Sequence, residues 1–173
     1  DAGQLVVQID GGVVGQEFAT IFSALGSEVI ILEALDRILY GVDAEFAKRY
    51  YTLLSAKGIR TELGTKVYRI EKQPDSLRVH YKKKGEDKFC QAETILVAAG
   101  RRPYFEDLFN SNLDIRVENN AIWVDQRLRT SVYGIYAIGD VIGNKMLAHL
   151  ASFQGEIVAE MAAGFGCNTT WEV

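Results

Sequence analysis

Residues 6–20, VVQIDGGVVGQEFAT, lead from a β-branched apolar stretch through a group of glycines into a helix-like segment. This order is typical of the strand, tight turn and helix that bind the pyrophosphate of a dinucleotide through backbone N–H groups. Gly12 would let the backbone approach the phosphates without a Cβ, and Gly15 would let the helix and the strand pack closely. A G-x-G-x-x-G fingerprint would begin with glycine at position 10, where this chain has Asp10.

A second apolar run, residues 28–33, ends with Glu33, which follows Gly12 by 33 − 12 = 21 positions. An acidic residue about 20 positions beyond the glycines accepts hydrogen bonds from the adenosine ribose. Because a carboxylate there would repel a 2′-phosphate, Glu33 predicts a site for NAD rather than NADP.

Asp10 is the main argument for the alternative, a strand–helix turn that binds no ligand. Aspartate tolerates positive φ better than most residues, so we expect the turn to form. The Asp10 carboxylate would then face the place of the pyrophosphate. Like-charge repulsion therefore predicts a site that keeps its architecture but binds NAD weakly.

The hydrophobic pattern predicts the elements that position these residues. In the first helix the apolar positions are Val14, Phe18, Ile21, Phe22 and Leu25. The expected order is strand 5–9, helix 13–25, strand 28–33, helix 43–57, strand 59–62, short antiparallel strands 67–71, 77–81 and 88–91, and a returning strand 94–99. This order predicts an α/β fold, a Rossmann-like domain with a parallel sheet plus an antiparallel meander.

A break in composition at GRRP, residues 100–103, follows the returning strand. Pro103 removes a backbone donor and favours an extended residue before it. We therefore place a domain boundary there, between residues 1–100 and residues 101–173. The second part is expected to contain a hairpin around residues 118–126, a strand at 134–140 and a helix at about 146–163.

The overall composition excludes several classes of partner. The 173 residues carry a net charge of −4, so the chain has no broad basic field for nucleic acid. It contains no apolar run of about eighteen residues that would cross a membrane. The dense basic run at residues 82–84 is interpreted as a solvated hairpin tip. Cys90 and Cys167 form no C-x-x-C or metal motif, so we expect two unpaired thiols in a cytoplasmic protein.

Four segments, GGVVGQEFATIFSALGSEVIILEALDRIL, TILVAAGRRP, RTSVYGIYAIGDV and MLAHLASFQG, resemble in this order the central part of the flavoprotein disulfide reductases. The resemblance spans nearly the whole chain. The group includes mercuric reductases, glutathione reductases and soluble transhydrogenases, but MLAH and Glu33 favour the dihydrolipoyl dehydrogenases. The resemblance implies an NAD-binding domain followed by part of an FAD-binding domain. It also implies a parent enzyme that passes electrons from a dithiol through FAD to NAD.

The same resemblance implies cofactor contacts for individual residues. Glu33 would bind the ribose, Val67 would line the adenine, and Gly100 would approach NAD after the returning strand. Asp140 would bind the ribityl chain of FAD. The NAD turn would consist of Gly11, Gly12, Val13, Val14, Gly15 and Glu17, with Glu17 near the nicotinamide. The segment facing the pyrimidine end of the flavin would be Met146, Leu147, Ala148 and His149, at a helix N-terminus whose dipole favours negative charge on reduced flavin.

Several parts of the family pattern have no counterpart in these residues. They are the first FAD fingerprint, the redox cysteine pair, and the C-terminal domain through which the parent would form a homodimer. We therefore expect an internal fragment without catalytic residues. Asp140 could instead cap a helix, Glu17 could be an ordinary exposed helix residue, and His149 could be structural. A fragment of a transhydrogenase or mercuric reductase, and a stand-alone NAD(H)-binding module, remain alternatives.

Overall fold

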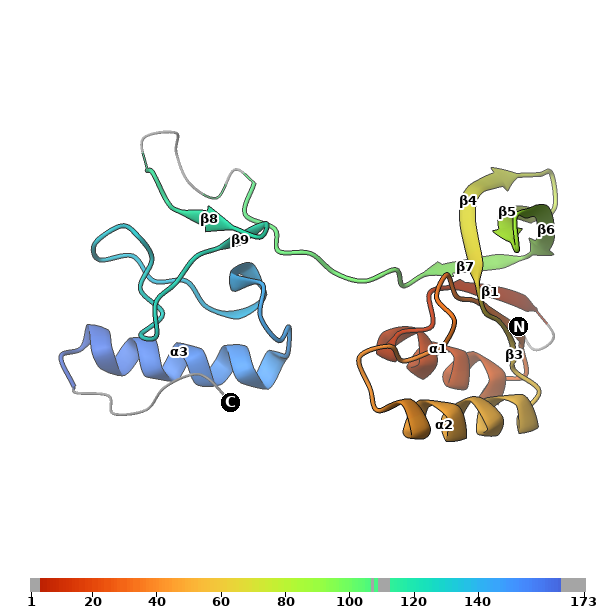
Figure 1. The fold of residues 1–173 in the computed structure, drawn as a ribbon, viewed down its shortest axis with the longest axis horizontal. Helices are drawn as coiled ribbons and strands as arrows, with labels where there is room; N and C mark the ends of the chain where they lie inside the picture. Colours follow the sequence, from red (N-terminus) through yellow and green to blue (C-terminus); the bar gives the residue numbers. More distant parts are fainter. Residues whose placement is uncertain (1–3, 107, 109–112, 166–173) are drawn as a thin grey trace. The chain divides into compact units, whose positions relative to one another are not determined.

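The computed structural model of the chain describes residues 4–106, 108 and 113–165. The chain divides into two compact units, residues 1–100 and residues 101–173 (Figure 1). Cys167 lies outside the described residues, and Cys90 is a free thiol in the first unit.

The first unit is built on a parallel sheet whose strands lie in the order β3-β2-β1-β7. Its strands are β1 (Leu5–Ile9), β2 (Glu28–Leu32), β3 (Arg60–Glu62) and β7 (Thr94–Val97). Val7 at the centre of β1 pairs with Ile30 on one side and Ile95 on the other. Because all four strands are parallel, the carboxyl ends of β1, β2 and β7 share one edge of the sheet. The chain order changes direction between β1 and β7, which is where open α/β sheets bind ligands.

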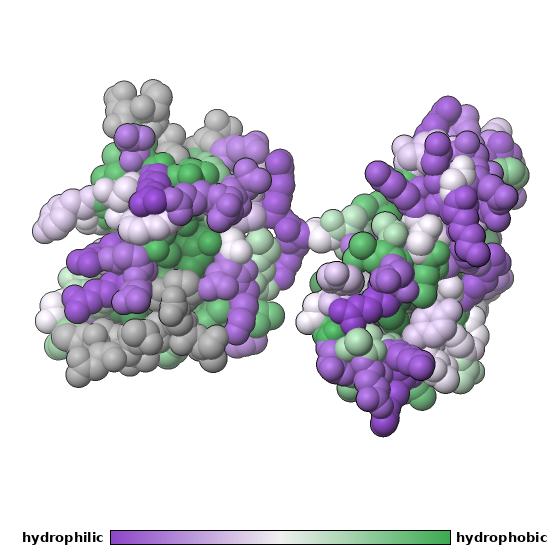
Figure 2. Space-filling model, in the orientation of Figure 1, coloured by the Kyte–Doolittle hydropathy of each residue, from purple (hydrophilic) through white to green (hydrophobic). Residues whose placement is uncertain are grey.

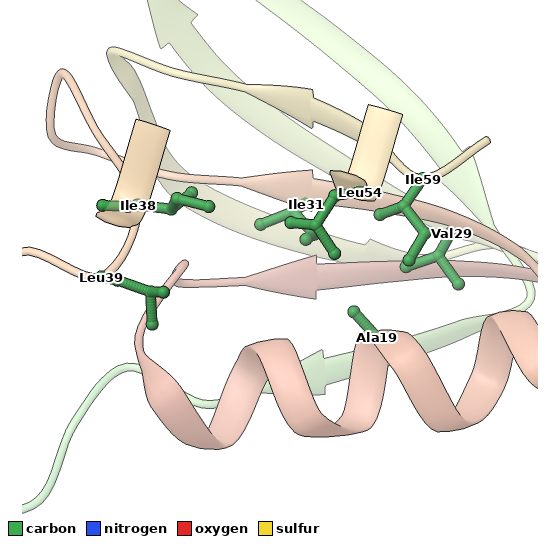
Figure 3. Packing of buried hydrophobic residues seen from close by; sticks show 8 residues of the cluster. Ala19, Val29, Ile31, Ile38, Leu39, Leu54 and Ile59 are labelled. Carbon is green, nitrogen blue, oxygen red and sulfur yellow. The ribbon is translucent and has the colours of Figure 1, made fainter. Parts of the chain in front are cut away.

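Two helices, α1 (Val13–Ala24) and α2 (Ala44–Ala56), pack with one face of this sheet in a single apolar cluster. Asp43 begins α2 because its carboxylate accepts the N–H groups of Glu45 and Phe46, at 3.0 and 3.1 Å. Figure 3 shows Ala19 projecting from α1 toward the strands, close to Val29 and Ile31 of β2. The other buried members of the cluster are Ile38, Leu39, Ala47, Leu54 and Ile59.

The apolar face expected for α1 is not the face that packs on the sheet. Val14, Ile21 and Leu25 are 48%, 51% and 67% exposed, and Phe18 is exposed as well. The buried positions are Gly15, Gln16 and Ala19, with Phe22 partly buried. A helix that lies close against a strand needs small side chains at the contact. This requirement decides which face of α1 is buried, and the larger apolar residues point elsewhere.

An antiparallel meander covers the opposite face of the parallel sheet. Its strands are β4 (Thr65–Lys72), β5 (Leu77–Lys83) and β6 (Glu86–Ala92). Val79 and Tyr81 of β5 are buried in one cluster with Val7, Ile30 and Leu32. Alternate residues of β2 therefore face the helices and the meander, and the parallel sheet is buried on both sides. The outward surface of the meander is mainly hydrophilic in Figure 2.

The hairpin between β5 and β6 turns at Lys84 and Gly85, with φ of +53° and +84°. Lys82 and Lys84 are exposed, as expected for a hairpin tip. Lys83 differs because its ammonium group donates a hydrogen bond to Glu62 at the end of β3. This contact ties the tip of the meander to the parallel sheet.

The second unit contains a short hairpin, a 3-10 helix and one long helix. These elements are β8 (Val117–Glu118), β9 (Ala121–Ile122), η1 (Gly139–Ile142) and α3 (Ala148–Ala162). Asn119 and Asn120 join β8 and β9 with φ of +49° and +59°, which is the geometry of a two-residue hairpin turn. Ile157 of α3 packs on the fully buried Leu128.

The strand predicted at residues 134–140 is wrong. Tyr136 forms an isolated bridge with Arg129, and η1 begins at Gly139. Gly134 and Gly139 have φ of +79° and +72°, which interrupts an extended strand at both ends. Within the described residues the segment has a strand partner at that single position, so it builds no ladder.

Candidate functional site

The turn from β1 into α1 brings the predicted glycines together at the shared edge of the sheet. Asp10 takes φ of +88°, as expected for a residue in place of the first glycine, and Gly12 is the N-cap of α1. A Cβ on Gly15 would lie 2.7 Å from the carbonyl oxygen of Asp10 and closer still to the amide nitrogen of Gln8. The close packing of helix and strand therefore requires glycine at position 15.

Two carboxylates accept the backbone N–H groups of this turn. Asp10 Oδ1 accepts the N–H of Gly12 at 2.6 Å, and Glu33 Oε2 accepts the N–H of Gly11 at 2.6 Å. The second oxygen of Glu33, Oε1, accepts the N–H of Leu35 at 2.7 Å. Glu33 follows β2 directly and is only 6% exposed, so the backbone holds its carboxylate rigidly against the glycine turn.

The N-terminus of α1 keeps donors for a further anion. The N–H groups of Val13 and Val14 come first in the helix, where no intrahelical acceptor exists, and no side chain caps this end. Both valines are exposed. Glu17 is exposed one turn further along the helix.

Gln8 and Gln16 belong to the same turn, although the sequence analysis did not single them out. Gln8 Nε2 donates to the carbonyl of Asp10 at 2.8 Å, and Gln16 Nε2 donates to the carbonyl of Gly11 at 3.1 Å. Gln8 is fully buried and Gln16 is 3% exposed. The available signal was a glutamine inside the apolar run VVQI and another beside Gly15 on the buried face of α1.

The amide oxygens of Gln8 and Gln16 are buried without a hydrogen-bond partner among the residues that the structure describes. Because both glutamines face carbonyl oxygens, which only accept, their nitrogen atoms must point into the turn. Each unsatisfied oxygen costs about 1–3 kcal/mol of stability. The fold therefore tolerates two unsatisfied amide oxygens while the amide nitrogens bind the carbonyls of the turn.

Val67 and Gly100 are two further predicted cofactor contacts. Neighbouring residues, and not these two themselves, connect β4 and β7 to the sheet edge that carries the glycine turn. The start of β4 is tied to the site because the N–H of Thr65 donates to the carbonyl of Glu33 at 2.7 Å. Val67 itself is half-buried and packs in the cluster beneath the meander. Gly100, with φ of +86° and open space around it, follows β7.

In the second unit, Arg101 joins the residues assigned to the flavin. Its Nη1 donates to Asp140 Oδ2 at 3.0 Å, and its Nη2 donates to the carbonyl of Met146. Leu147 is the N-cap of α3 without a side-chain cap, and Ala148 and His149 are exposed in the first turn. Arg101 was not among the predicted site residues, although it stands directly after Gly100 in GRRP.

The titratable groups outside the glycine turn include Glu62, whose backbone carbonyl accepts the N–H of Glu33 at 2.9 Å. The hydrogen bond from Lys83, together with that from Arg60, lowers the pKa of Glu62 below its ordinary value of 4.5. Burial raises the pKa of the Cys90 thiol, which favours the unreactive protonated form. Within residues 4–106, 108 and 113–165, no three His, Cys, Asp or Glu side chains are grouped to hold a metal ion. No helix in these ranges is long and apolar enough to span a membrane.

Comparison with known families gives a match over most of the chain. Residues 3–155 match the family described as pyridine nucleotide-disulphide oxidoreductase. The dihydrolipoyl dehydrogenase of Bacillus subtilis is 39% identical over 163 residues, which cover 93% of this chain and 34% of that protein. The dihydrolipoyl dehydrogenase of Geobacillus stearothermophilus is 37% identical over 92% of this chain and 34% of its own length. The chain thus spans about a third of the length of these relatives.

Two solved structures share the fold. The Cu(II) complex of the HOCl-induced flavoprotein disulfide reductase RclA from Escherichia coli is 30% identical with a TM-score of 0.88, covering 98% of this chain and 39% of that one. LpdA from Mycobacterium tuberculosis is 25% identical with a TM-score of 0.88, covering 97% of this chain and 36% of that one. The expectation of a flavoprotein disulfide reductase fold is confirmed.

Proposed function

The chain belongs to the pyridine nucleotide-disulphide oxidoreductase family, and we propose that residues 1–100 bind NAD(H) at the turn between β1 and α1. The observation that carries the proposal is the position of Glu33. Its carboxylate is buried at the end of β2 and held by the N–H groups of Gly11 and Leu35. A carboxylate accepts about four hydrogen bonds, so each oxygen keeps capacity for a ribose hydroxyl.

The residues of the turn fit a pyrophosphate in part. Gly12 and Gly15 leave the backbone without side chains, and the first N–H groups of α1, those of Val13 and Val14, have no intrahelical acceptor. The helix dipole favours an anion at the same place. Asp10 opposes binding because it already accepts the N–H of Gly12. The proposed site therefore combines a ribose position at Glu33 with a phosphate position in which Asp10 already uses one of the donors.

Glu33 also supports a preference for NADH over NADPH. A 2′-phosphate on the ribose would bring negative charge against a buried carboxylate whose hydrogen-bond donors, among the described residues, are the uncharged N–H groups of Gly11 and Leu35. Such like-charge contacts cost several kcal/mol at low effective dielectric. We expect NADH to bind at least about tenfold more tightly than NADPH, a difference of about 1.4 kcal/mol.

Calorimetric titration of the chain with NADH and NADPH tests this function. Glu33→Gln keeps the shape of the side chain and one oxygen acceptor but removes the charge, so it should narrow the ratio of the two affinities. Glu45→Gln is the matched control, because Glu45 is exposed on α2 and pairs with the exposed Arg49, away from the turn. Equal affinities of the wild type for the two cofactors would contradict the assignment of Glu33. No binding of either cofactor would contradict the function.

Residues 101–173 contribute, in the same proposal, to an FAD site. FAD supplies the electron transfer between dithiol and nicotinamide. Arg101 holds Asp140 and the carbonyl of Met146 together, which places a carboxylate beside the uncapped N-terminus of α3. Asp140 would accept a ribityl hydroxyl, and the N–H groups of Ala148 and His149 would donate to the flavin ring.

For the longer enzyme we propose the oxidation of dihydrolipoamide by NAD, in a cytoplasmic homodimer. The support is the identity of 39% and 37% to two dihydrolipoyl dehydrogenases. Assays of that enzyme with dihydrolipoamide, with mercuric ion and for hydride exchange between NADPH and NAD separate this activity from those of mercuric reductases and transhydrogenases. Activity with mercuric ion alone, or hydride exchange between NADPH and NAD alone, would contradict dihydrolipoamide as the substrate.

A further inference from the structure

Each of the two buried glutamines holds one peptide group of the glycine turn. The carbonyl of Asp10 and the N–H of Gly11 belong to the same planar trans peptide, so they point in opposite directions. Gln8 Nε2 binds that carbonyl at 2.8 Å, while the N–H on the other side donates to Glu33 at 2.6 Å. Gln8 therefore fixes the direction in which the N–H of Gly11 points.

Gln16 does the same for the next peptide. Its Nε2 binds the carbonyl of Gly11 at 3.1 Å, beside the N–H of Leu39, which donates to the same carbonyl at 3.0 Å. The N–H of Gly12 on the opposite side donates to Asp10 Oδ1 at 2.6 Å. The two glutamines come from different elements, β1 and α1, and reach adjacent peptides from the interior. Both N–H groups consequently face carboxylate oxygens on the ligand side of the turn.

Packing alone does not account for these glutamines. Gln8 is fully buried, Gln16 is 3% exposed, and the amide oxygen of each lacks a partner among the described residues. An apolar side chain of similar size would remove the unsatisfied amide oxygen, but it would also take this donor from the backbone carbonyl. Buried polar groups that are only partly satisfied indicate a role other than stability. Among the described residues, each glutamine side chain donates its hydrogen bond to a carbonyl of the turn.

We propose that Gln8 and Gln16 are positioning residues for the dinucleotide, Gln8 for its ribose and Gln16 for its pyrophosphate. Gln8 holds the peptide whose N–H, that of Gly11, fixes the Glu33 carboxylate. Gln16 holds the peptide whose N–H, that of Gly12, faces the place of a pyrophosphate oxygen. The inference rests on the proposed NAD(H) function and deepens it, because it separates the phosphate part of the site from the ribose part that Glu33 forms.

The test compares two ligands on the variants Gln8→Leu and Gln16→Leu. ADP-ribose carries the pyrophosphate, whereas adenosine carries only the ribose and the base. We expect Gln8→Leu to lose about tenfold in affinity for both ligands, or about 1.4 kcal/mol, because the N–H that it directs holds Glu33. Gln16→Leu should lose about threefold for ADP-ribose alone, with adenosine binding unchanged, because the N–H of Leu39 still binds the Gly11 carbonyl. Ile31→Val is the control, because it alters the core at β2 without touching the turn.

Amide hydrogen exchange in the ligand-free chain gives a second readout that a general loss of stability would not reproduce. Gln8→Leu should accelerate exchange at Gly11 more than at Gly12, and Gln16→Leu should do the reverse. Ile31→Val should change neither selectively. Because the two variants lie on different elements, a failure of one to fold leaves the other to decide.

Several outcomes overturn the inference. One is wild-type affinity for ADP-ribose in folded Gln8→Leu, and another is an equal loss for ADP-ribose and adenosine in Gln16→Leu. Exchange that rises uniformly across the first unit would also assign the glutamines a purely structural role. A wild-type chain that binds neither NADH nor ADP-ribose would refute the proposed function itself, and this failure is visible before any variant is made.

Discussion

Replacing Asp10 by glycine should strengthen the binding of NADH. Asp10 Oδ1 accepts the N–H of Gly12 at 2.6 Å, and this N–H is one that a pyrophosphate oxygen at the turn would use. The bound dinucleotide must therefore displace the carboxylate or tolerate it as a close negative neighbour. Asp10→Gly removes the charge and frees the donor in one step.

The size of the effect follows from the charge separation. A phosphate bound at the start of α1 would lie about 5 Å from the Asp10 carboxylate, and at an effective dielectric of about 20 the repulsion is about 3 kcal/mol. Salt screening and movement of the side chain reduce this figure. We expect a gain of at least about tenfold in affinity, or about 1.4 kcal/mol. The gain should shrink as the ionic strength rises.

The fold should survive this substitution with little change in stability. Glycine accepts φ of +88°, the value at position 10, without the strain that a Cβ introduces. The variant loses the hydrogen bond from Gly12 to the carboxylate, worth about 1 kcal/mol. The two effects oppose each other, so the free energy of unfolding should change by less than about 1 kcal/mol.

Calorimetric titration with NADH at low and high salt, on wild type, Asp10→Gly and Asp10→Asn, measures the effect. Asparagine keeps the acceptor for the N–H of Gly12 and tolerates positive φ, so it removes the charge alone. We expect Asp10→Asn to fall between the other two and to lose most of the salt dependence. Unchanged or weaker NADH binding by folded Asp10→Gly at low salt would refute the reasoning.

Three further predictions concern stability and colour. Glu62→Gln should lower the free energy of unfolding at pH 7 by about 1 kcal/mol, because Glu62 accepts hydrogen bonds from Lys83 and Arg60. These contacts lower the pKa of Glu62 from 4.5, so the stability difference between wild type and Glu62→Gln should be fully present above that pH. In denaturation curves it should be lost as the pH falls below 4.5 and through the lower pKa of the folded chain. A stability difference independent of pH would argue against the ion pair. The purified chain should be colourless and should not reduce lipoamide, because the first FAD fingerprint has no counterpart in its residues; a stoichiometric flavin spectrum would contradict this. Gly15→Ala should destabilise the first unit by at least about 1 kcal/mol in thermal unfolding, because its Cβ would lie 2.7 Å from the carbonyl of Asp10. Gly41→Ala, where nothing lies within 4 Å, is the control and should be close to neutral.

The alternating elements of the first unit could be predicted because local patterns determine them. A short apolar run and a helical period survive in almost any packing, so β1, α1, β2 and α2 lie within one or two residues of the expected ranges. The face of α1 could not be predicted in this way. The distance between helix and sheet decides which side chains fit, and Gly15 and Ala19 allow an approach that Ile21 and Leu25 would prevent.

The predicted strand at residues 134–140 shows where local patterns fail to predict an element. Its composition favours an extended chain, but a strand also needs neighbours that pair with it, and such neighbours come from elsewhere in the sequence. The place of Glu33 beside the glycine turn could be predicted from its spacing, because the end of β2 and that turn meet at one sheet edge in any fold with this order of elements. The hydrogen bond from Arg101 to Asp140 joins residues 39 positions apart, which no local pattern reveals.

Asp10, Gln8 and Gly15 depend on one another in three dimensions. The conformation of Asp10 turns its carbonyl toward α1, where a polar donor must meet it, and Gln8 supplies that donor at 2.8 Å. The amide of Gln8 in turn occupies the space in which a side chain at position 15 would project. Glycine at position 10 would keep the same carbonyl direction and the same donor. A change in NADH affinity in Asp10→Gly can therefore be assigned to the carboxylate, because Gln8 and Gly15 retain their contacts when it is removed.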